Sequence, residues 1–346
     1  MHFEFSLPHV DFGRGKLPTK WKDAAGQEPW IVDKLEFTIA ERTWVLRKLV
    51  KFEGSLCPVD VAAALALKAK VHFKLPRLEQ ACVLQVSEVG WSLQEAKVVA
   101  DDICWMLHIG LGQRVTWTEV GLREGETYSV QNARSVNAPE SASRGGPIRD
   151  DGEHEIRNFL EAFYPVYRAD VGWWRVTADW FAIARESNIV QVAGLVASVL
   201  LDRVTLFCLK RYKFPKQIDE ALKTDLTDGS PSRNAFEKQI DDFMKVAISD
   251  KWNKSGALVA KIREWNDQPP FEKKVGTVFE QFGLGAPSEL TLKNRNSLAH
   301  SGELSSKTKD IGAYHDEIVE IITSLLLKMA KYQGPYFVPG AGVRQM

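Results

Sequence analysis

The first third of the chain alternates apolar and polar residues, which is the pattern of half-buried antiparallel strands. The alternation is clearest in HFEFSL (2–7) and KLEFTI (34–39). It continues less regularly over 42–54 and 65–75, although the alanine-rich stretch from Val61 to Lys70 also fits a helix. RVTWTEVGLREGETYSV (114–130) predicts a hairpin, so this part of the chain is expected to be rich in β-structure.

One helix interrupts these strands. Ser92 and Glu95 have the spacing of a capping box, in which each side chain bonds the backbone N–H of the other residue. The residues that follow are amphipathic as far as Gly110, where a glycine can end the helix.

From Glu155 onward the apolar residues recur with helical spacing almost to the end of the chain. The predicted helices cover about 153–168, 174–186, 188–213, 232–252, 256–266, 271–282, 288–300 and 313–332. Residues 137–154 have few apolar residues and collect proline, glycine, serine and charge, as linkers do. The sequence therefore predicts an α+β protein, with a β-rich domain over 1–136, a linker over 137–154 and a helical domain over 155–346.

The most apolar run, Ile189 to Leu201, is broken by polar residues and stopped by Asp202-Arg203. We interpret it as a buried helix that is too short to span a bilayer, and expect no membrane partner. The four cysteines lie far apart and form no CxxC pair. Reduced, buried thiols are typical of a cytoplasmic protein, and neither a metal site nor a cofactor is expected.

The balance of charges argues against a protein that coats long nucleic acids. Forty-five basic residues balance forty-five acidic ones, so the chain has no global positive field. An enzyme that grips a few phosphates locally remains compatible with this balance.

A candidate site of that kind lies in LKNRNSLAHSGE (292–303), where Arg295 and His300 are separated by four residues. The spacing alone carries little weight, because Arg149 and His154 repeat it in the acidic linker. The copy at Arg295 and His300 lies in a segment with helix-start and helix-stop signals, which could hold its side chains in place. Ser288 can cap a helix there, and Ser301-Gly302 can end it.

The residue types suit phosphate chemistry. Arg295 offers a planar guanidinium fork for a phosphate group, and Asn296 adds an amide beside it. A histidine at a helix C-terminus is favoured in its charged form and can act as an acid. Five residues subtend about 140° on a helix, so Arg295 and His300 converge on one ligand only where the helix ends. We expect both side chains to face solvent.

RNSLAH (295–300), late in a helical domain and followed by one long apolar helix, resembles the Arg-x4–6-His motif of the HEPN superfamily. Asn296 matches the polar residue that follows the arginine in that family. The resemblance covers about residues 155–337, and the ending KMAKYQGPYFVP is most similar to the ApeA-type anti-phage proteins.

The resemblance implies a HEPN-like helical bundle and a metal-independent endoribonuclease with Arg295, Asn296 and His300 as catalytic residues. The expected partners are an RNA substrate, such as tRNA or another structured RNA, and a second copy of the chain in a homodimer with a composite site. The dimer is expected to form through the apolar face of helix 188–213 or helix 313–332. Abortive infection, released by a phage-derived trigger at the amino-terminal domain, is the implied setting.

The function and the roles of four further residues each have an alternative interpretation. A catalytically silent dimerisation or sensor module that binds RNA or a protein is the alternative function. The tryptophans of VGWWRVTADW (Trp173, Trp174, Trp180) could stack on unpaired bases, but packing fits them better. Asp202 could orient Arg295 or His300, or form a plain ion pair.

Overall fold

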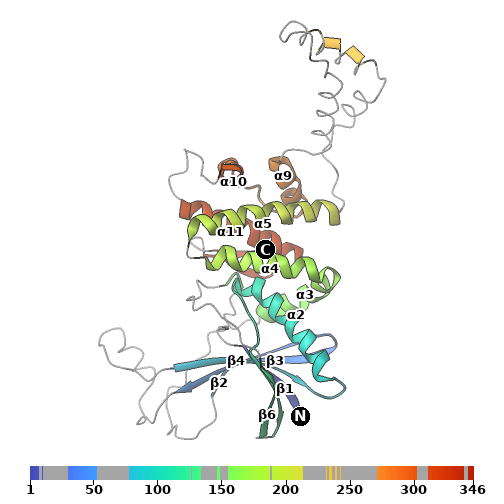
Figure 1. The fold of residues 1–346 in the computed structure, drawn as a ribbon, viewed down its shortest axis with the longest axis vertical. Coiled ribbons are helices and arrows are strands. Elements are labelled where there is room, and N and C mark those ends of the chain that lie inside the picture. The colour runs from blue at the N-terminus through green and yellow to red at the C-terminus, as the bar shows by residue number, and fades with distance from the viewer. Residues whose placement is uncertain are drawn as a thin grey trace, which may run out of the picture. The chain divides into compact units, whose positions relative to one another are not determined.

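The computed structural model shows a mixed α+β protein (Figure 1). It describes residues 1–7, 10, 30–52, 78–125, 127–133, 146–148, 155–187, 189–212, 271–301, 311–338 and 342–346, with short helical pieces between 231 and 242. The strands are β1 (His2–Leu7), β2 (Trp30–Ile39), β3 (Arg42–Phe52), β4 (Leu78–Ser87), β5 (Glu119–Glu124), β6 (Thr127–Ala133), β7 (Pro335–Val338) and β8 (Gly342–Gln345). The helices are α2 (Leu93–Leu111), α3 (Glu155–Ala169), α4 (Val171–Glu186), α5 (Val190–Arg211), α9 (Phe271–Gln281), α10 (Glu289–Ser301) and α11 (Ile311–Met329).

The first six strands form one antiparallel sheet in the order β2-β3-β4-β1-β5-β6. Its register places one apolar residue from each of five neighbouring strands in a single row. The row consists of Leu35, Leu46, Leu84, Phe5 and Val120, each at most 1% exposed. Because side chains alternate along a strand, this row marks the face of the sheet that builds the core.

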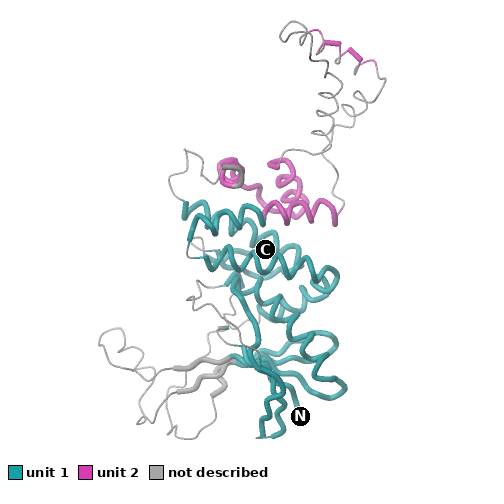
Figure 2. Tube along the Cα trace, in the orientation of Figure 1, with its two compact units in different colours: residues 1–200, 308–346 teal, residues 201–307 magenta. Residues whose placement is uncertain are grey.

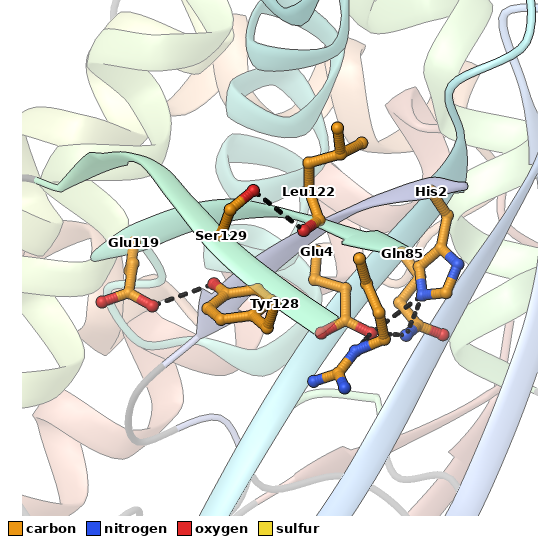
Figure 3. Close-up of polar contacts among 8 residues, drawn as sticks. His2, Glu4, Gln85, Glu119, Leu122, Tyr128 and Ser129 are labelled. Carbon is orange, nitrogen blue, oxygen red and sulfur yellow. Dashed lines mark hydrogen bonds and ion pairs between the residues drawn. The ribbon is translucent and has the colours of Figure 1, made fainter. Parts of the chain in front are cut away.

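The opposite face of the sheet carries a polar cluster around Glu4 (Figure 3). The Glu4 carboxylate accepts hydrogen bonds from Arg123 Nε at 2.7 Å, from His2 Nε2 at 2.9 Å and from the Gln85 amide. Burial alone would raise the pKa of Glu4, but these donors outweigh it and the pKa lies below its ordinary value. The cluster is a satisfied buried carboxylate that joins three strands.

Helix α2 begins with the predicted capping box. The Ser92 N–H donates to Glu95 Oε2 at 2.8 Å, and the Ser92 hydroxyl oxygen accepts the Glu95 N–H at 3.3 Å. The helix ends one residue beyond the predicted Gly110, because Gly112 adopts the left-handed conformation (φ 61°) that closes it.

A buried carboxylate connects α2 to the next two helices. Asp102 is fully buried and accepts hydrogen bonds from Tyr167 at 3.0 Å, Arg168 at 2.7 Å and Arg175 at 3.1 Å. Arg175 also donates to the Tyr167 hydroxyl at 3.0 Å. A charge removed from water needs partners of this kind, so the network fixes α3 and α4 against α2.

The described chain divides into two compact units, residues 1–200 with 308–346 and residues 201–307 (Figure 2). This division differs from the predicted domains 1–136 and 155–346, because α3, α4 and α11 belong to the unit that contains the sheet. One contact shows why: the Thr38 N–H of edge strand β2 donates to the Glu161 carboxylate of α3 at 2.8 Å. The linker prediction at 137–154 rests mostly on residues outside the described ranges.

Helix α5 agrees with the predicted helix 188–213 but is longer than the apolar run Ile189 to Leu201 from which the membrane argument was made. The apolar segment continues beyond Asp202 and forms a helix of 22 residues. Among the described residues it is the one helix whose length and composition would allow it to cross a membrane, and half of its most apolar window is buried inside the protein. The prediction that it is too short to span a bilayer is therefore wrong, although core helices share these properties.

The other predicted elements agree with the structure to within a few residues, apart from two omissions. The strand β4 and the hairpin β7–β8 were not predicted. The predicted elements at 65–75 and 256–266, and most of 232–252, lie outside the described residues.

Candidate active site

Helix α10 carries the candidate motif and begins where the sequence predicts. The Ser288 hydroxyl oxygen accepts the Thr291 N–H at 3.1 Å and is 2.7 Å from the Thr291 hydroxyl. The helix ends at Ser301, within one residue of the prediction. In its first turn Glu289 pairs with Lys293 at 2.5 Å, one turn further along.

Arg295 is buried, which corrects the expectation that it faces solvent. It is 8% exposed, and its guanidinium carbon lies 3.8 Å from the centre of the Phe271 ring. Its Nη1 donates to the Asn296 side-chain oxygen at 2.8 Å. The aromatic ring covers one face of the guanidinium, so hydrogen-bond acceptors reach it in the plane of the fork.

Asn296 connects Arg295 to helix α9. Its Nδ2 donates to the Glu272 carboxylate of α9 at 2.5 Å. A carboxylate only accepts hydrogen bonds and a guanidinium only donates them. The two neighbours therefore fix which way the Asn296 amide points, with its oxygen toward Arg295 and its nitrogen toward Glu272.

Asp202 of α5 forms an ion pair with Arg295, in agreement with the second of the two roles considered for it. Its Oδ1 lies 3.6 Å from Arg295 Nη2, which is beyond the range of a good hydrogen bond. The Asp202 side chain is 38% exposed, whereas that of Arg295 is 10% exposed. A carboxylate held this loosely at the surface is easily displaced by another anion.

His300 lies in the last turn of α10, but its side chain is outside the described residues. The structure therefore brings together Arg295, Asn296 and Asp202 of the predicted residues and leaves the position of the His300 imidazole untested.

Phe271 and Glu272 contact the motif and were not predicted. They open α9, 24 residues before the arginine and asparagine that they contact. The sequence indicates only a helix start at this point, with an acidic residue in its first turn. No local sequence pattern predicts a contact between residues that are 24 positions apart in the chain.

Trp174 of the tryptophan cluster packs internally, as favoured above for the whole cluster. Trp174 is 1% exposed, and its ring lies 4.7 Å from Trp173 and 4.6 Å from Phe163. Trp180 is partly exposed. The described part of the chain contains no group of three His, Cys, Asp or Glu side chains arranged to hold a metal ion.

Comparisons of the chain with protein-family models, with curated proteins and with solved structures give no match.

Proposed function

We propose that the protein is a metal-independent endoribonuclease of the HEPN type, with Arg295, Asn296 and His300 in its catalytic site. The observation that supports this most is the hydrogen-bonded pair of Arg295 and Asn296, held on one turn of α10 within five residues of His300. A guanidinium with a fixed orientation is suited to bind a phosphate in one defined geometry.

The reaction requires only groups that the chain and the RNA can supply. The 2′-oxygen of the RNA attacks the adjacent phosphorus while the bond from phosphorus to the 5′-oxygen breaks. One imidazole takes the proton of the 2′-hydroxyl, and another donates a proton to the departing 5′-oxygen. The products are a 2′,3′-cyclic phosphate and a free 5′-hydroxyl. Arg295 stabilises the charge that develops on the phosphoryl oxygens.

Two proton-transfer groups in this scheme require two copies of the motif, because each chain offers one His300. A two-fold dimer would bring two copies of α10 together. The exposed apolar side chains of α5 favour this helix as the contact: Val192, Leu195, Val199 and Leu206 are 37–44% exposed. Helix α11, the other candidate, has its apolar stripe almost entirely buried within the chain.

The biological setting rests on the family resemblance alone. We propose RNA, including tRNA and other structured RNAs, as the substrate class and abortive infection in anti-phage defence as the role. A phage-derived trigger would act on the amino-terminal sheet region.

A silent dimerisation or sensor module is the second candidate, and one observation favours it. Arg295 is buried, stacked on Phe271 and paired with Asp202, as an arginine with a purely structural role would be. The two functions predict different effects of conservative substitutions in the motif: such substitutions slow RNA cleavage if the protein is a ribonuclease, whereas a silent module cleaves no RNA.

The test compares RNA cleavage by His300→Gln and Arg295→Lys with that of His154→Gln. His154 belongs to the linker copy of the Arg-x4-His spacing and is a matched control. Loss of an acid–base group should slow cleavage about 10²–10⁴-fold. Lysine keeps the charge of Arg295 but lacks its planar fork, and should also slow cleavage by about tenfold or more. Melting curves check the fold, and wild-type rates in His300→Gln would exclude the proposed chemistry.

A further inference from the structure

The start of helix α9 holds the Arg295–Asn296 pair from two sides. Phe271 is the first residue of α9, and its ring lies 3.8 Å from the guanidinium carbon of Arg295. Glu272 is the second, and its carboxylate lies 2.5 Å from Asn296 Nδ2. Both contacts lie within the compact unit formed by residues 201–307.

The two contacts restrict different motions of the arginine. Stacking on the Phe271 ring fixes the plane of the guanidinium. The hydrogen bond from Nη1 to the Asn296 oxygen fixes its rotation within that plane. That bond exists only while the amide oxygen points to Arg295, and the acceptor-only carboxylate of Glu272 enforces this orientation.

We propose that Phe271 and Glu272 are positioning residues of the ribonuclease site, which set the direction in which the Arg295 guanidinium meets the scissile phosphate. This proposal rests on the proposed function. Neither side chain takes part in proton transfer. Their contribution is to hold the cation ready before the RNA binds, so that it does not have to reorient in the transition state.

Kinetics of the full chain test the proposal. Glu272→Ala frees the Asn296 amide and should lower kcat by about tenfold, with a smaller change in KM, because the guanidinium acts on charge that develops in the transition state. Glu272→Gln keeps an acceptor oxygen and should restore kcat to within about threefold of the wild type. Phe271→Leu removes the ring and should lower kcat by about threefold to tenfold, whereas Phe271→Tyr keeps it.

Two substitutions serve as matched controls. Glu280→Ala removes an exposed carboxylate from the last turn of the same helix. Phe282→Leu removes a ring that packs on Tyr212 at 5.4 Å. Both should retain wild-type kcat. If Glu272→Ala cleaves RNA within twofold of the wild-type rate, or if Glu280→Ala loses as much activity as Glu272→Ala, the positioning role is excluded.

A second measurement does not depend on activity. The Nη1–H resonances of Arg295, assigned by their disappearance in Arg295→Lys, should exchange with solvent slowly in the wild type, because Nη1 donates to the Asn296 oxygen. In Glu272→Ala they should exchange at least about tenfold faster, since the guanidinium loses its fixed partner. Unchanged exchange would overturn the proposal even if the protein cleaves RNA. A wild-type chain that cleaves no RNA would exclude the proposed function, whereas the exchange result would still decide whether α9 holds Arg295.

Discussion

The described neighbours of Arg295 include an aromatic ring, an amide oxygen and a carboxylate, and the proposed reaction adds a phosphate. The sequence identifies Arg295 and Asn296 as candidates because they lie in one short motif with a plausible helix cap. It does not predict that Arg295 is buried. Phe271 contributes to this burial, and its contact with the guanidinium depends on how α9 and α10 pack.

Asp202 provides a prediction at the same scale. Its carboxylate lies 3.6 Å from Arg295 Nη2 without a good hydrogen bond, where it neutralises the charge that an RNA phosphate would use. Asp202→Asn should therefore lower KM for RNA by about threefold to tenfold, because a partly screened repulsion of about 1 kcal/mol is removed. Cleavage rates measured at a series of RNA concentrations give KM. An unchanged or higher KM would show that Asp202 does not compete with the substrate.

At the scale of single elements, local sequence signals predicted the helix starts correctly, whereas strands that lack such signals were missed. The capping box of α2 and the Ser288 cap of α10 depend on residues three apart, so both could be recognised in the sequence. Strand β4 was missed although Cys82, Leu84 and Val86 alternate in it, because its outward positions are not consistently charged. The hairpin β7–β8 was missed because its two strands have four residues each.

Helix α2 also contains a buried histidine with a testable consequence. His108 is 6% exposed, and one ring nitrogen lies 2.8 Å from the Cys104 carbonyl oxygen. Burial lowers its pKa from 6.5 to about 4. Between these values the unfolded chain binds a proton that the folded chain does not. This contribution to stability is therefore fully present above pH 6.5 and is lost as the pH falls toward 4.

We expect the free energy of unfolding to fall by about 2 kcal/mol between pH 7 and pH 5 because of His108. Urea unfolding followed by tryptophan fluorescence measures the free energy of unfolding at each pH. His108→Gln serves as the reference because glutamine does not titrate. The variant should show a flatter pH dependence than the wild type. Parallel profiles would mean that His108 is protonated as readily in the folded protein as in the unfolded chain.

At the scale of the whole molecule, the α+β class followed from the change of period along the chain, from two to 3.6 residues. The division into compact units did not follow, because it depends on tertiary contacts such as the Asp102 network and the bond between Thr38 and Glu161. A composition shift at 137–154 marks a change of secondary structure, and the helices that follow it still pack with the sheet.

The composite site predicts a homodimer. Light scattering at micromolar concentration should give about twice the chain mass of 39.0 kDa. Replacing both Leu195 and Val199 by glutamate puts charge on the exposed stripe of α5 and should give monomers that no longer cleave RNA. Val176→Glu, on α4 and 40% exposed, is the control and should remain dimeric. A monomer that cleaves RNA at the wild-type rate would refute the composite site.

The most direct test of the account is cleavage of an RNA that carries a single 2′-deoxy sugar at the cut position, in excess EDTA. In the proposed reaction the 2′-hydroxyl is the nucleophile, imidazole groups transfer the protons and guanidinium groups stabilise the charge on the phosphate. The all-ribose RNA should therefore be cut in EDTA to a 2′,3′-cyclic phosphate or its opened 3′-phosphate. The deoxy substrate should resist, because it lacks the nucleophile. Cleavage of both substrates at equal rates, or activity that disappears with EDTA, would contradict the chemistry assigned to Arg295 and His300.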